Sequence, residues 1–327
     1  MQWIEELFGW AQQGLFELAV QPIMFSFGLG HLLEDGYVAT GWLLVGLIQI
    51  AVLLAIIGPL QRWRPVEPVQ DVRAIRTDVL YTLLHRLGLF RVALFFSVEP
   101  LFDAMFGSLK VAGFSTLHID QVWAGVSDLP LASFLIYLVV FDFVDYWIHR
   151  GQHGFSWWWS LHALHHSQRQ MTMWSDNRNH LLDDLLRDGL LVVLGQLIGV
   201  GPGQFVAIVA ITQLSESLQH ANVRLHFGRI GERLWISPRF HRLHHSIGLG
   251  HERGAHGDKL PGGRSPALGG HNFGVLLPWW DMLFGTANFE LRYDPTGIRD
   301  QVEGGRDYGR GFWAQQWLGL LRLVGKA

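Results

Sequence analysis

Two short stretches of the chain carry the same histidine pattern, His-x-x-His-His, at His162, His165 and His166 and again at His241, His244 and His245. On a helix the first and third of these residues share a face, whereas the adjacent pair diverges by about 100°. A diverging pair does not easily serve one metal ion, but it can offer one ring to each of two ions a few ångströms apart. Two such elements facing each other would bracket a dinuclear metal centre.

A third pair, His149 and His153, is also spaced by one helical turn. The chain has no cysteine, which excludes disulfides, thiolate metal sites and a cysteine nucleophile. Zinc sites close with about four ligands, and this chain offers more than twice that number, whereas imidazole also suits iron, copper and nickel. We expect an all-nitrogen shell around two iron ions, unlike the glutamate-rich shells of soluble di-iron bundles.

The composition is that of a membrane protein. Of the 327 residues, 49% are hydrophobic and 16% are charged, against about 25% charged residues in soluble domains. The formal net charge of −3 gives no sign of a nucleic-acid-binding surface, so no nucleic acid partner is expected. The stretch MQWIEELFGW at the N-terminus has two glutamates and no basic region, so it does not resemble a cleaved signal peptide.

Five apolar stretches are candidates to position the histidines beside a bilayer, because a spanning helix needs about 20 apolar residues. The clearest are residues 36–61, 129–148 and 189–215, and the last is broken by Gly-Val-Gly-Pro-Gly, as in a kinked span or a helical hairpin. Residues 18–33 and 87–106 contain proline or charges, and they are either further spans or buried or interfacial helices. We therefore expect an all-α integral membrane protein with about four transmembrane helices.

The histidine clusters follow the second span. Apart from His149, which directly follows that span, they lie in two polar stretches, residues 151–188 and 218–327, which we expect to form a helical cap. Arg62, Arg64 and Arg150 follow the first two spans and place this cap in the cytoplasm by the positive-inside rule, in a plasma, inner or ER-type membrane. The chain then divides into N-terminal membrane helices (1–128), a catalytic domain (129–290) and a C-terminal segment (291–327). That last segment is expected at the membrane interface, or else as a packed helix.

Six motifs in order resemble the sterol desaturase and fatty acid hydroxylase superfamily of integral-membrane di-iron oxygenases. They are DYWIHRGQH, WSLHALHHS, RNH, QHANVRL, RFHRLHHS and NFGVLLPWWDMLFGT, which together cover about residues 129–286. Each motif alone is weak, and the ordered set is specific. The resemblance implies a membrane-bound, O2-dependent lipid hydroxylase or desaturase of lipid biosynthesis, with a dimetal site of two iron ions held by histidines.

The resemblance also implies how the ligands divide. One iron would be held by His149, His162, His165, His241 and His244, and the other by His153, His166, His245, His220 and His180. His226 is the alternative to His180, because some relatives supply a closely spaced histidine pair before the final cluster. The glycine-rich stretch 247–270 is an insertion relative to many members. It is interpreted as a slack surface loop, a lid over a lipid head group, or a source of ligands through His251 or His271.

Metal-bound histidines usually donate their second nitrogen to a carboxylate or carbonyl. Asp145 lies four residues before His149, and Glu216 lies four before His220, so both carboxylates are expected to orient a ligand. Asp176, Asp183 and Asp184 are expected to be solvated.

Hydroxylation and desaturation remain open from the sequence, as does the lipid: sterol, fatty acyl chain or polar membrane lipid. Two other functions compete, a divalent-metal transporter and a membrane haem electron carrier. A transporter predicts ionisable residues near the middle of the spans, and a haem carrier predicts single histidines within them. No Gly-x-Gly-x-x-Gly nucleotide loop occurs and no cysteines are present for an iron–sulfur cluster. Electrons are therefore expected from a separate cytochrome b5- or ferredoxin-type reductase.

Overall fold

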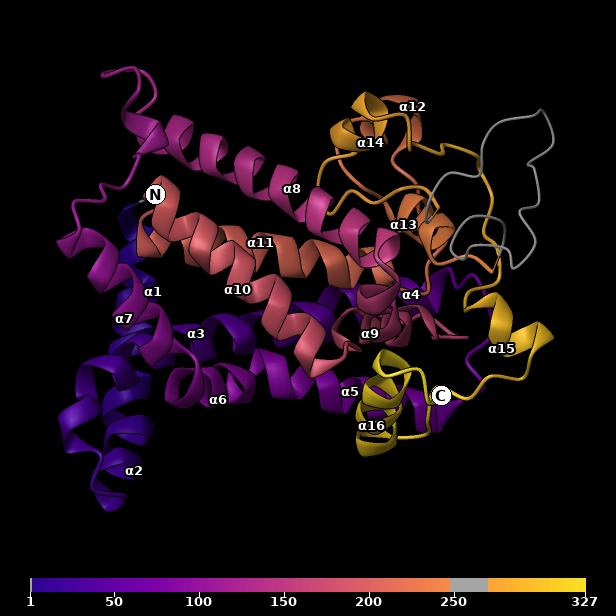
Figure 1. The fold of residues 1–327 in the computed structure, drawn as a ribbon, viewed down its shortest axis with the longest axis horizontal. Coiled ribbons are helices and arrows are strands. Elements are labelled where there is room, and N and C mark those ends of the chain that lie inside the picture. The colour runs from indigo at the N-terminus through magenta and orange to yellow at the C-terminus, as the bar shows by residue number, and fades with distance from the viewer. Residues whose placement is uncertain (1, 248–269) are drawn as a thin grey trace. The chain divides into compact units, whose positions relative to one another are not determined.

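The computed structural model describes residues 2–247 and 270–327, which form helices and loops (Figure 1). Within these ranges the extended pairing is an isolated antiparallel bridge between Ser246 and Thr296. The all-α prediction is confirmed for this part of the chain. The interpretations of the insertion as a slack loop or a lid, and of His251 as a ligand, fall on residues outside those the structure describes.

The chain forms two compact units, Met1–Ala55 with Leu83–Ser115 and Ile56–Thr82 with Thr116–Ala327. The predicted boundaries at residues 128 and 290 do not mark the edges of these units. The C-terminal segment belongs to the second unit because the helix α16 (Phe312–Leu323) packs against α9 (Ser156–His166). Trp313 and Trp317 on the other face of this packed helix are exposed, so the interfacial position of the segment stays a prediction.

The first unit consists of helices around α3 (Leu33–Val52). The others are α1 (Gln2–Leu15), η1 (Phe16–Val20), α2 (Gln21–Ser26), η2 (Gly30–Leu32), α6 (Leu89–Ser97) and α7 (Glu99–Val111). Gly46 of α3 allows a close approach, because a Cβ there would lie 1.7 Å from the carbonyl oxygen of Arg86. The guanidinium of Arg86 also donates to the Gln49 side chain at 3.0 Å.

The second unit carries every predicted site residue. Its main helices are α8 (Pro130–Gly154), α9, α10 (Leu181–Ile198), α11 (Pro202–His220), α13 (Pro238–His244) and α16. Shorter elements are α4 (Gly58–Trp63), η4 (Ile119–Gln121), η5 (Ser175–Asn177), α12 (Gly228–Gly231), α14 (Trp279–Leu283) and α15 (Arg299–Glu303). Two elements, η3 (Leu53–Ile57) and α5 (Val72–Arg86), belong in part to each unit.

Two helical stretches of the described residues are long and apolar enough to cross a membrane, Gly30–Trp63 and Pro130–Gly154. They match the first two predicted spans. The pair α5 and α6, bent by 52°, would give a third if it acts as one span. Residues 189–215, the third predicted stretch, are not among these candidates.

The reason lies in the break at Gly199–Gly201, where the chain reverses. Gly199 ends α10 in the left-handed region at φ 77°, and Pro202 begins α11 at a position that suits proline. The first half of α10 carries Asp183, Asp184, Arg187 and Asp188, too many charges for a span. Of the two predicted alternatives, a kinked span and a helical reversal, the structure has the reversal.

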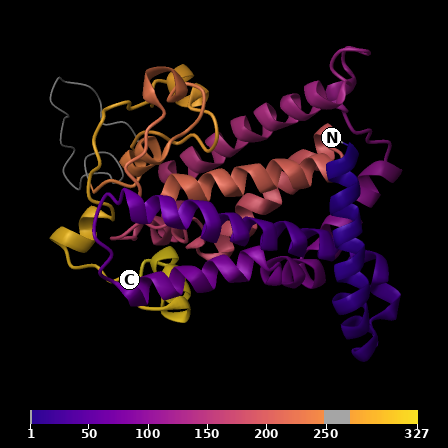
Figure 2. The same ribbon diagram turned by 180° about the vertical axis from the view of Figure 1, so that it is seen from behind.

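An apolar core holds α8, α10 and α11 together. Tyr137, Leu138 and Phe141 of α8 pack with Ile198, Ile208 and the loop residues Leu276 and Leu277. At the opposite end from the Gly199 turn, α8 leads into α9 and α11 packs on α13. Figures 1 and 2 show these helix ends coming together near α9 and α13 from both sides. The histidine clusters lie at this end.

Candidate metal centre

Local sequence signals set the ends of the helices that carry the histidines. Helix α8 starts at Pro130, which suits the first helical position, and brings His149 and His153 to its last turns. The extended Phe155 separates it from α9, so the chain changes direction before His162. Helix α13 is capped by Ser237, whose Oγ accepts a hydrogen bond from the Phe240 amide at 3.2 Å.

Nine of the ten predicted histidines come together. The converging nitrogens form three groups, each with its atoms within 4.8 Å of one another: His149, His153, His162 and His166; His165, His220, His241 and His245; and His166, His244 and His245. We call the first group A and the second group B. The third group joins them, because it shares His166 with group A and His245 with group B. All nine side chains are buried, with at most 8% exposed.

The division between the groups differs from the one that the family resemblance implied. On α9, His162 and His166 enter group A together, whereas His165 enters group B. On the second element, His241 and His245 share group B. Residues four apart point the same way on a helix, and the intervening residue is turned by about 100° from its neighbour. The prediction that adjacent histidines diverge therefore agrees with the geometry, while the pairing of first and second residues does not.

The spacing of the group B nitrogens suits a bound cation. The Nε2 atom of His220 lies 3.1 Å from Nε2 of His165 and 3.2 Å from that of His241, which lies 3.1 Å from Nε2 of His245. Nitrogens bound to one ion at about 2.1 Å would be roughly 3.0 to 3.4 Å apart, depending on the coordination geometry. Lone pairs aimed at each other at this distance repel, and a shared cation removes that repulsion.

Group A passes a second test of fit. The Nε2 atom of His162 is buried and has no hydrogen-bond partner within the described residues. Buried nitrogen acceptors are normally satisfied, so an unpartnered one within a four-histidine group fits the role of a metal ligand. Both groups therefore fit a metal ion.

Four of these histidines have their Nδ1 atom fixed by an acceptor on the polypeptide. The acceptors are the carbonyls of Phe273 for His149, His271 for His244 and Glu216 for His220, each at 2.8 Å, and the Asp183 carboxylate for His162 at 2.9 Å. Carbonyls and carboxylates only accept, so each Nδ1 carries the proton and each Nε2 keeps a lone pair. This tautomer is the one that a metal at Nε2 requires.

The two predicted orienting carboxylates act differently from the prediction. The carboxylate of Asp145 accepts two hydrogen bonds from Arg187, at 2.8 and 2.6 Å, and that of Glu216 accepts one at 3.3 Å. These contacts tie α8, α10 and α11 together one turn before the ligands. A side chain four residues earlier points toward the start of the helix, so the ligand ring reaches the main-chain carbonyl of Glu216 instead.

Asp183 is the orienting carboxylate that sequence reasoning missed. It is 2% exposed, and besides His162 it accepts hydrogen bonds from Gln152 and Trp158, at 2.8 and 2.7 Å. Asp184 is buried as well, and Asp176 accepts from Ser217. The expectation that these three aspartates are solvated is therefore wrong. The available signal was an acidic pair at the start of an otherwise apolar helix.

Three further histidines lie outside the groups. His180 caps α10: its Nδ1 accepts from the Leu182 amide at 3.1 Å, and its Nε2 donates to the Gln316 carbonyl at 2.9 Å. Both nitrogens are engaged with the main chain, so we remove His180 from the proposed ligands. The alternative, His226, accepts from the Gly228 amide at 3.2 Å. The main-chain carbonyl of His271 accepts the hydrogen bond from Nδ1 of His244, so His271 orients a grouped histidine through its main chain.

Burial opposes the protonation of four of the grouped histidines. Burial, followed by the charge of neighbouring histidines, holds the pKa of His165, His166 and His241 well below 6.5. Burial likewise lowers the pKa of His220. Neutral imidazole is the form that binds a metal, so the fold favours the state required for binding.

Aromatic rings lie against the histidines. The Phe273 ring packs edge-on against those of His149, His153 and His244, with centroids 5.3 to 6.0 Å apart. Trp159 contacts His153 and His166 from another side, at 5.0 and 5.3 Å. These rings keep water away from the groups they contact, which strengthens electrostatic interactions there.

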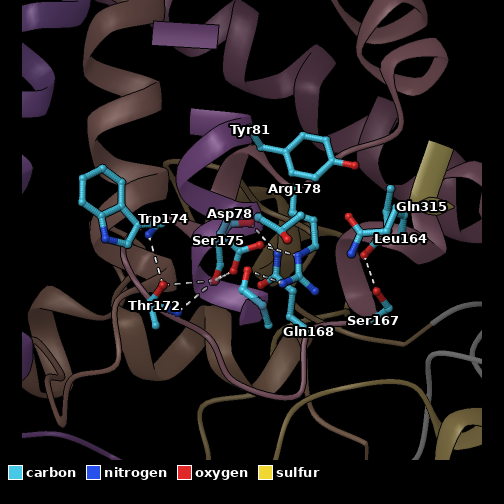
Figure 3. A network of polar contacts seen from close by, with 12 residues as sticks. Asp78, Tyr81, Leu164, Ser167, Gln168, Thr172, Trp174, Ser175, Arg178 and Gln315 are labelled. Atoms are coloured by element: carbon cyan, nitrogen blue, oxygen red, sulfur yellow. Dashed lines mark hydrogen bonds and ion pairs between the residues drawn. The ribbon is translucent and has the colours of Figure 1, made fainter. Parts of the chain in front are cut away.

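The loop that follows α9 is anchored to α5. The carboxylate of Asp78 accepts from Arg178 and from the hydroxyl of Ser175, the latter at 3.3 Å, and that hydroxyl accepts from the Thr172 amide at 2.9 Å. Figure 3 shows this network, with Asp78 and Arg178 pointing toward each other. Because the loop starts directly after His166, the anchor fixes the end of α9 that carries the ligands.

The chain matches a fatty acid hydroxylase family model over residues 134–286, which include all nine grouped histidines. It is similar to the ornithine lipid hydroxylase OlsE of Rhizobium tropici, with 30% identity over 248 residues, 75% of this chain and 67% of that protein. It is also similar to an alkylglycerol monooxygenase of Caenorhabditis elegans, with 25% identity over 194 residues, 58% of this chain and 34% of that protein. The chain thus covers about a third of the second relative. No solved structure matches it.

Proposed function

Because the chain belongs to the fatty acid hydroxylase and sterol desaturase superfamily, we propose that it is a membrane-bound, O2-dependent hydroxylase of a polar membrane lipid. The observation that carries the proposal is a set of nine buried histidines: eight form two groups of four, and the ninth, His244, lies in the group that links them. Both groups consist of histidines alone, and a third group shares one ring with each of them, which supports a dinuclear centre.

The metal that we propose is iron. Four imidazoles alone also suit zinc, but zinc has no redox chemistry, and oxygen insertion into an unactivated C–H bond requires a metal that changes oxidation state. Two bound iron ions would supply the activation of O2, with one oxygen atom entering the C–H bond and the other leaving as water at the expense of two electrons and two protons.

The residues of the chain contribute orientation and a dry environment. Asp183 and the carbonyls of Phe273, His271 and Glu216 hold four rings with Nε2 toward the groups. Phe273 and Trp159 exclude water beside them. Rings that are positioned before the metal binds do not have to be ordered at the moment of reaction.

The relatives and the location of the site support the proposed substrate class. One relative is named for ornithine lipid and the other for alkylglycerol, both polar lipids. His149 and His153 lie at the end of a candidate membrane span, Pro130–Gly154, which suits a substrate that approaches from the bilayer. Both relatives are named for oxygen insertion, which favours hydroxylation over desaturation.

Two further parts of the proposal concern the surroundings of the enzyme. The arginines after the two candidate spans, Arg62, Arg64 and Arg150, favour a cytoplasmic site. Electrons would come from a separate cytochrome b5- or ferredoxin-type reductase, since the sequence carries neither cysteines nor a nucleotide-binding glycine loop.

The competing functions have less support. A metal transporter predicts unpaired ionisable groups along the spans, but Asp142 within α8 accepts from the amides of Leu276 and Leu277 and from the Trp280 ring nitrogen, which is a structural role. A haem carrier predicts isolated pairs of histidines. The grouping of nine does not suit it.

The proposal is tested by lipid mass spectrometry of cells that express the protein, a His162→Ala variant, or neither. We expect a polar lipid to gain one oxygen atom with the wild type alone. If lipid profiles are identical in all three, with the protein present in the membrane, the proposed activity is wrong.

A further inference from the structure

The segment His271–Gly274 links two metal-site histidines to a buried carboxylate. The Nδ1 atom of His149, in group A, donates to the carbonyl of Phe273, and that of His244 donates to the carbonyl of His271. The two histidines come from different helices, α8 and α13, whereas their acceptors are two residues apart. The position of this one segment therefore determines the orientation of both rings.

Asp281, on α14, holds the segment from the side opposite His149. Its carboxylate accepts from the amides of Phe273 and Gly274, both at 2.8 Å, and from the hydroxyl of Thr286 at 2.6 Å. Asp281 is fully buried. Residue 274 must be glycine, because a Cβ there would lie 2.8 Å from the carboxylate and 2.7 Å from Ile236.

Asn272 fixes the turn between the two acceptors. It has φ 61°, in the left-handed region that asparagine tolerates better than most residues. Its side-chain amide donates to the carbonyls of Phe240 and Asn288, and its oxygen accepts from the Asn288 amide. Phe240 precedes His241 in α13, so Asn272 connects the segment to the helix that carries His241 and His244 and leads directly into His245.

One peptide group connects Asp281 to His149. The carbonyl of Phe273 and the amide of Gly274 belong to the same planar unit, so the N–H donates to the Asp281 carboxylate while the oxygen accepts from His149. Hydrogen bonds in such a chain polarise one another. A negative charge on the amide side makes the carbonyl a stronger acceptor, which raises the basicity of His149 as a ligand.

We infer that Asp281 is a positioning residue that strengthens metal binding by group A through the Phe273–Gly274 peptide. The inference rests on the proposed function, since it requires that the groups bind metal. Group A is then backed by two carboxylates, directly by Asp183 on His162 and indirectly by Asp281 on His149. His220 in group B is backed by the neutral carbonyl of Glu216. The effect of Asp281 is therefore selective.

The buried carboxylate remains ionised near neutrality. Burial raises the pKa of Asp281 to about 6, against the lowering effect of its hydrogen bonds to Thr286 and to the amides of Gly274 and Phe273. Replacement by asparagine keeps the size, but it removes the charge and sets an NH2 group against at least one backbone N–H donor. Asp281→Asn therefore weakens the chain of contacts without opening a cavity.

The chain offers a matched control in Asp142. This carboxylate is also buried and also accepts from two consecutive amides of the same loop and from a side-chain nitrogen. Its amides, those of Leu276 and Leu277, do not belong to a peptide whose carbonyl accepts from a grouped histidine in the described structure. Asp142→Asn reproduces the structural loss without the proposed link to His149.

The test uses Co2+ as the probe. Full-length metal-free protein in detergent is titrated with Co2+ and followed by optical absorption, with the midpoint of thermal unfolding measured in parallel. Asp281→Asn is examined alone, with His153→Ala, which disables group A, and with His220→Ala, which disables group B. In the His220→Ala background, where only group A binds, we expect Asp281→Asn to weaken Co2+ binding about 10- to 100-fold, the typical cost of losing an outer partner. In the His153→Ala background, where only group B binds, we expect Asp281→Asn to have no effect on Co2+ affinity. Asp142→Asn is expected to lower the midpoint comparably but to leave both affinities near those of the wild type.

Three results would overturn the inference: equal weakening of both groups by Asp281→Asn, the same selective loss in Asp142→Asn, or no change in either group. If Asp281→Asn does not fold, Thr286→Val takes its place, because it removes one hydrogen-bond donor to the carboxylate. We expect Thr286→Val to lower the Co2+ affinity of group A by a smaller factor, and an unchanged affinity in this variant would refute the inference. Failure of the wild type to bind any Co2+ would instead refute the proposed metal centre.

Discussion

The Nδ1 atom of His162 lies 2.9 Å from Oδ2 of Asp183, while Oδ1 of the same carboxylate accepts from Gln152 and Trp158. Helices α8, α9 and α10 therefore meet at one buried negative charge beside group A. A charge in this position both orients the ring and makes it a better donor to a cation.

Asp183→Asn should lower the affinity of group A for metal by about 10- to 100-fold. An amide oxygen accepts a hydrogen bond more weakly than a carboxylate, and the new NH2 group would face the N–H donors of His162 or of Gln152 and Trp158. Trp158→Phe is the control, since it removes a donor to Oδ1 and leaves the contact with His162. Co2+ titration of both variants measures the difference. Equal affinities for the two would contradict the role of Asp183.

Arg187 neutralises two carboxylates one turn before the ligands. Arg187→Met should destabilise the fold by about 3 kcal/mol, the lower end for a broken buried pair, because the arginine side chain is partly exposed. Adding Asp145→Asn should recover part of the loss, since it removes the charge that was left unpaired. Chemical denaturation of the three variants provides the comparison. A double variant no more stable than Arg187→Met would contradict the pairing.

Gly319 of α16 touches the ring of His180, and a Cβ there would lie 2.2 Å from its Cδ2 atom. Gly319→Ala should therefore destabilise by roughly 1–3 kcal/mol, as overpacking does. The control is Gly203→Ala in α11, where nothing lies within 4 Å of the added carbon, and which should stabilise slightly through helix propensity. Thermal unfolding with His180→Ala as a second substitution should show relief of the clash. Additive losses would argue against this contact.

Metal-free protein should lose stability in mild acid. Burial holds the folded pKa values of His165, His166, His220 and His241 below 6.5, the value in an unfolded chain. Their contribution is complete above about pH 6.5 and declines as the pH falls, because below it the unfolded chain binds more protons. Each such group costs about 1.4 kcal/mol per pH unit. Unfolding midpoints of stripped protein between about pH 8 and about pH 5 test this. A flat profile would mean that the rings are protonated in the fold.

The spacing of the histidines was informative because helix geometry converts spacing into direction. His162 and His166, or His241 and His245, are four residues apart, so each pair faces one way whatever surrounds the helix. The two clearest spans were equally readable, since long uncharged stretches have few alternatives in a bilayer. Eight of the ten proposed ligands rest on helical spacing, whereas His220 and His180 were proposed from the family resemblance.

The errors arose where tertiary contacts decide. Asp183 and His162 are 21 residues apart, and only the crossing of α9 and α10 brings them together. The carbonyls of Phe273 and His271 carry no side-chain signal at all. His180 had the residue type of a ligand, but it begins a helix, and its nitrogens are used for capping and for contact with α16. Which histidines share a group depends on how four helices, α8, α9, α11 and α13, face one another.

The central claim is that nine histidines form two metal sites, and metal stoichiometry tests it most directly. Protein loaded anaerobically with Fe2+ and freed of excess metal is analysed for iron as wild type, His153→Ala, His220→Ala and His180→Ala. We predict two ions per chain in the wild type and in His180→Ala, and one in each of the other two variants. Full iron content in His153→Ala and His220→Ala, or a loss in His180→Ala equal to theirs, would contradict the account.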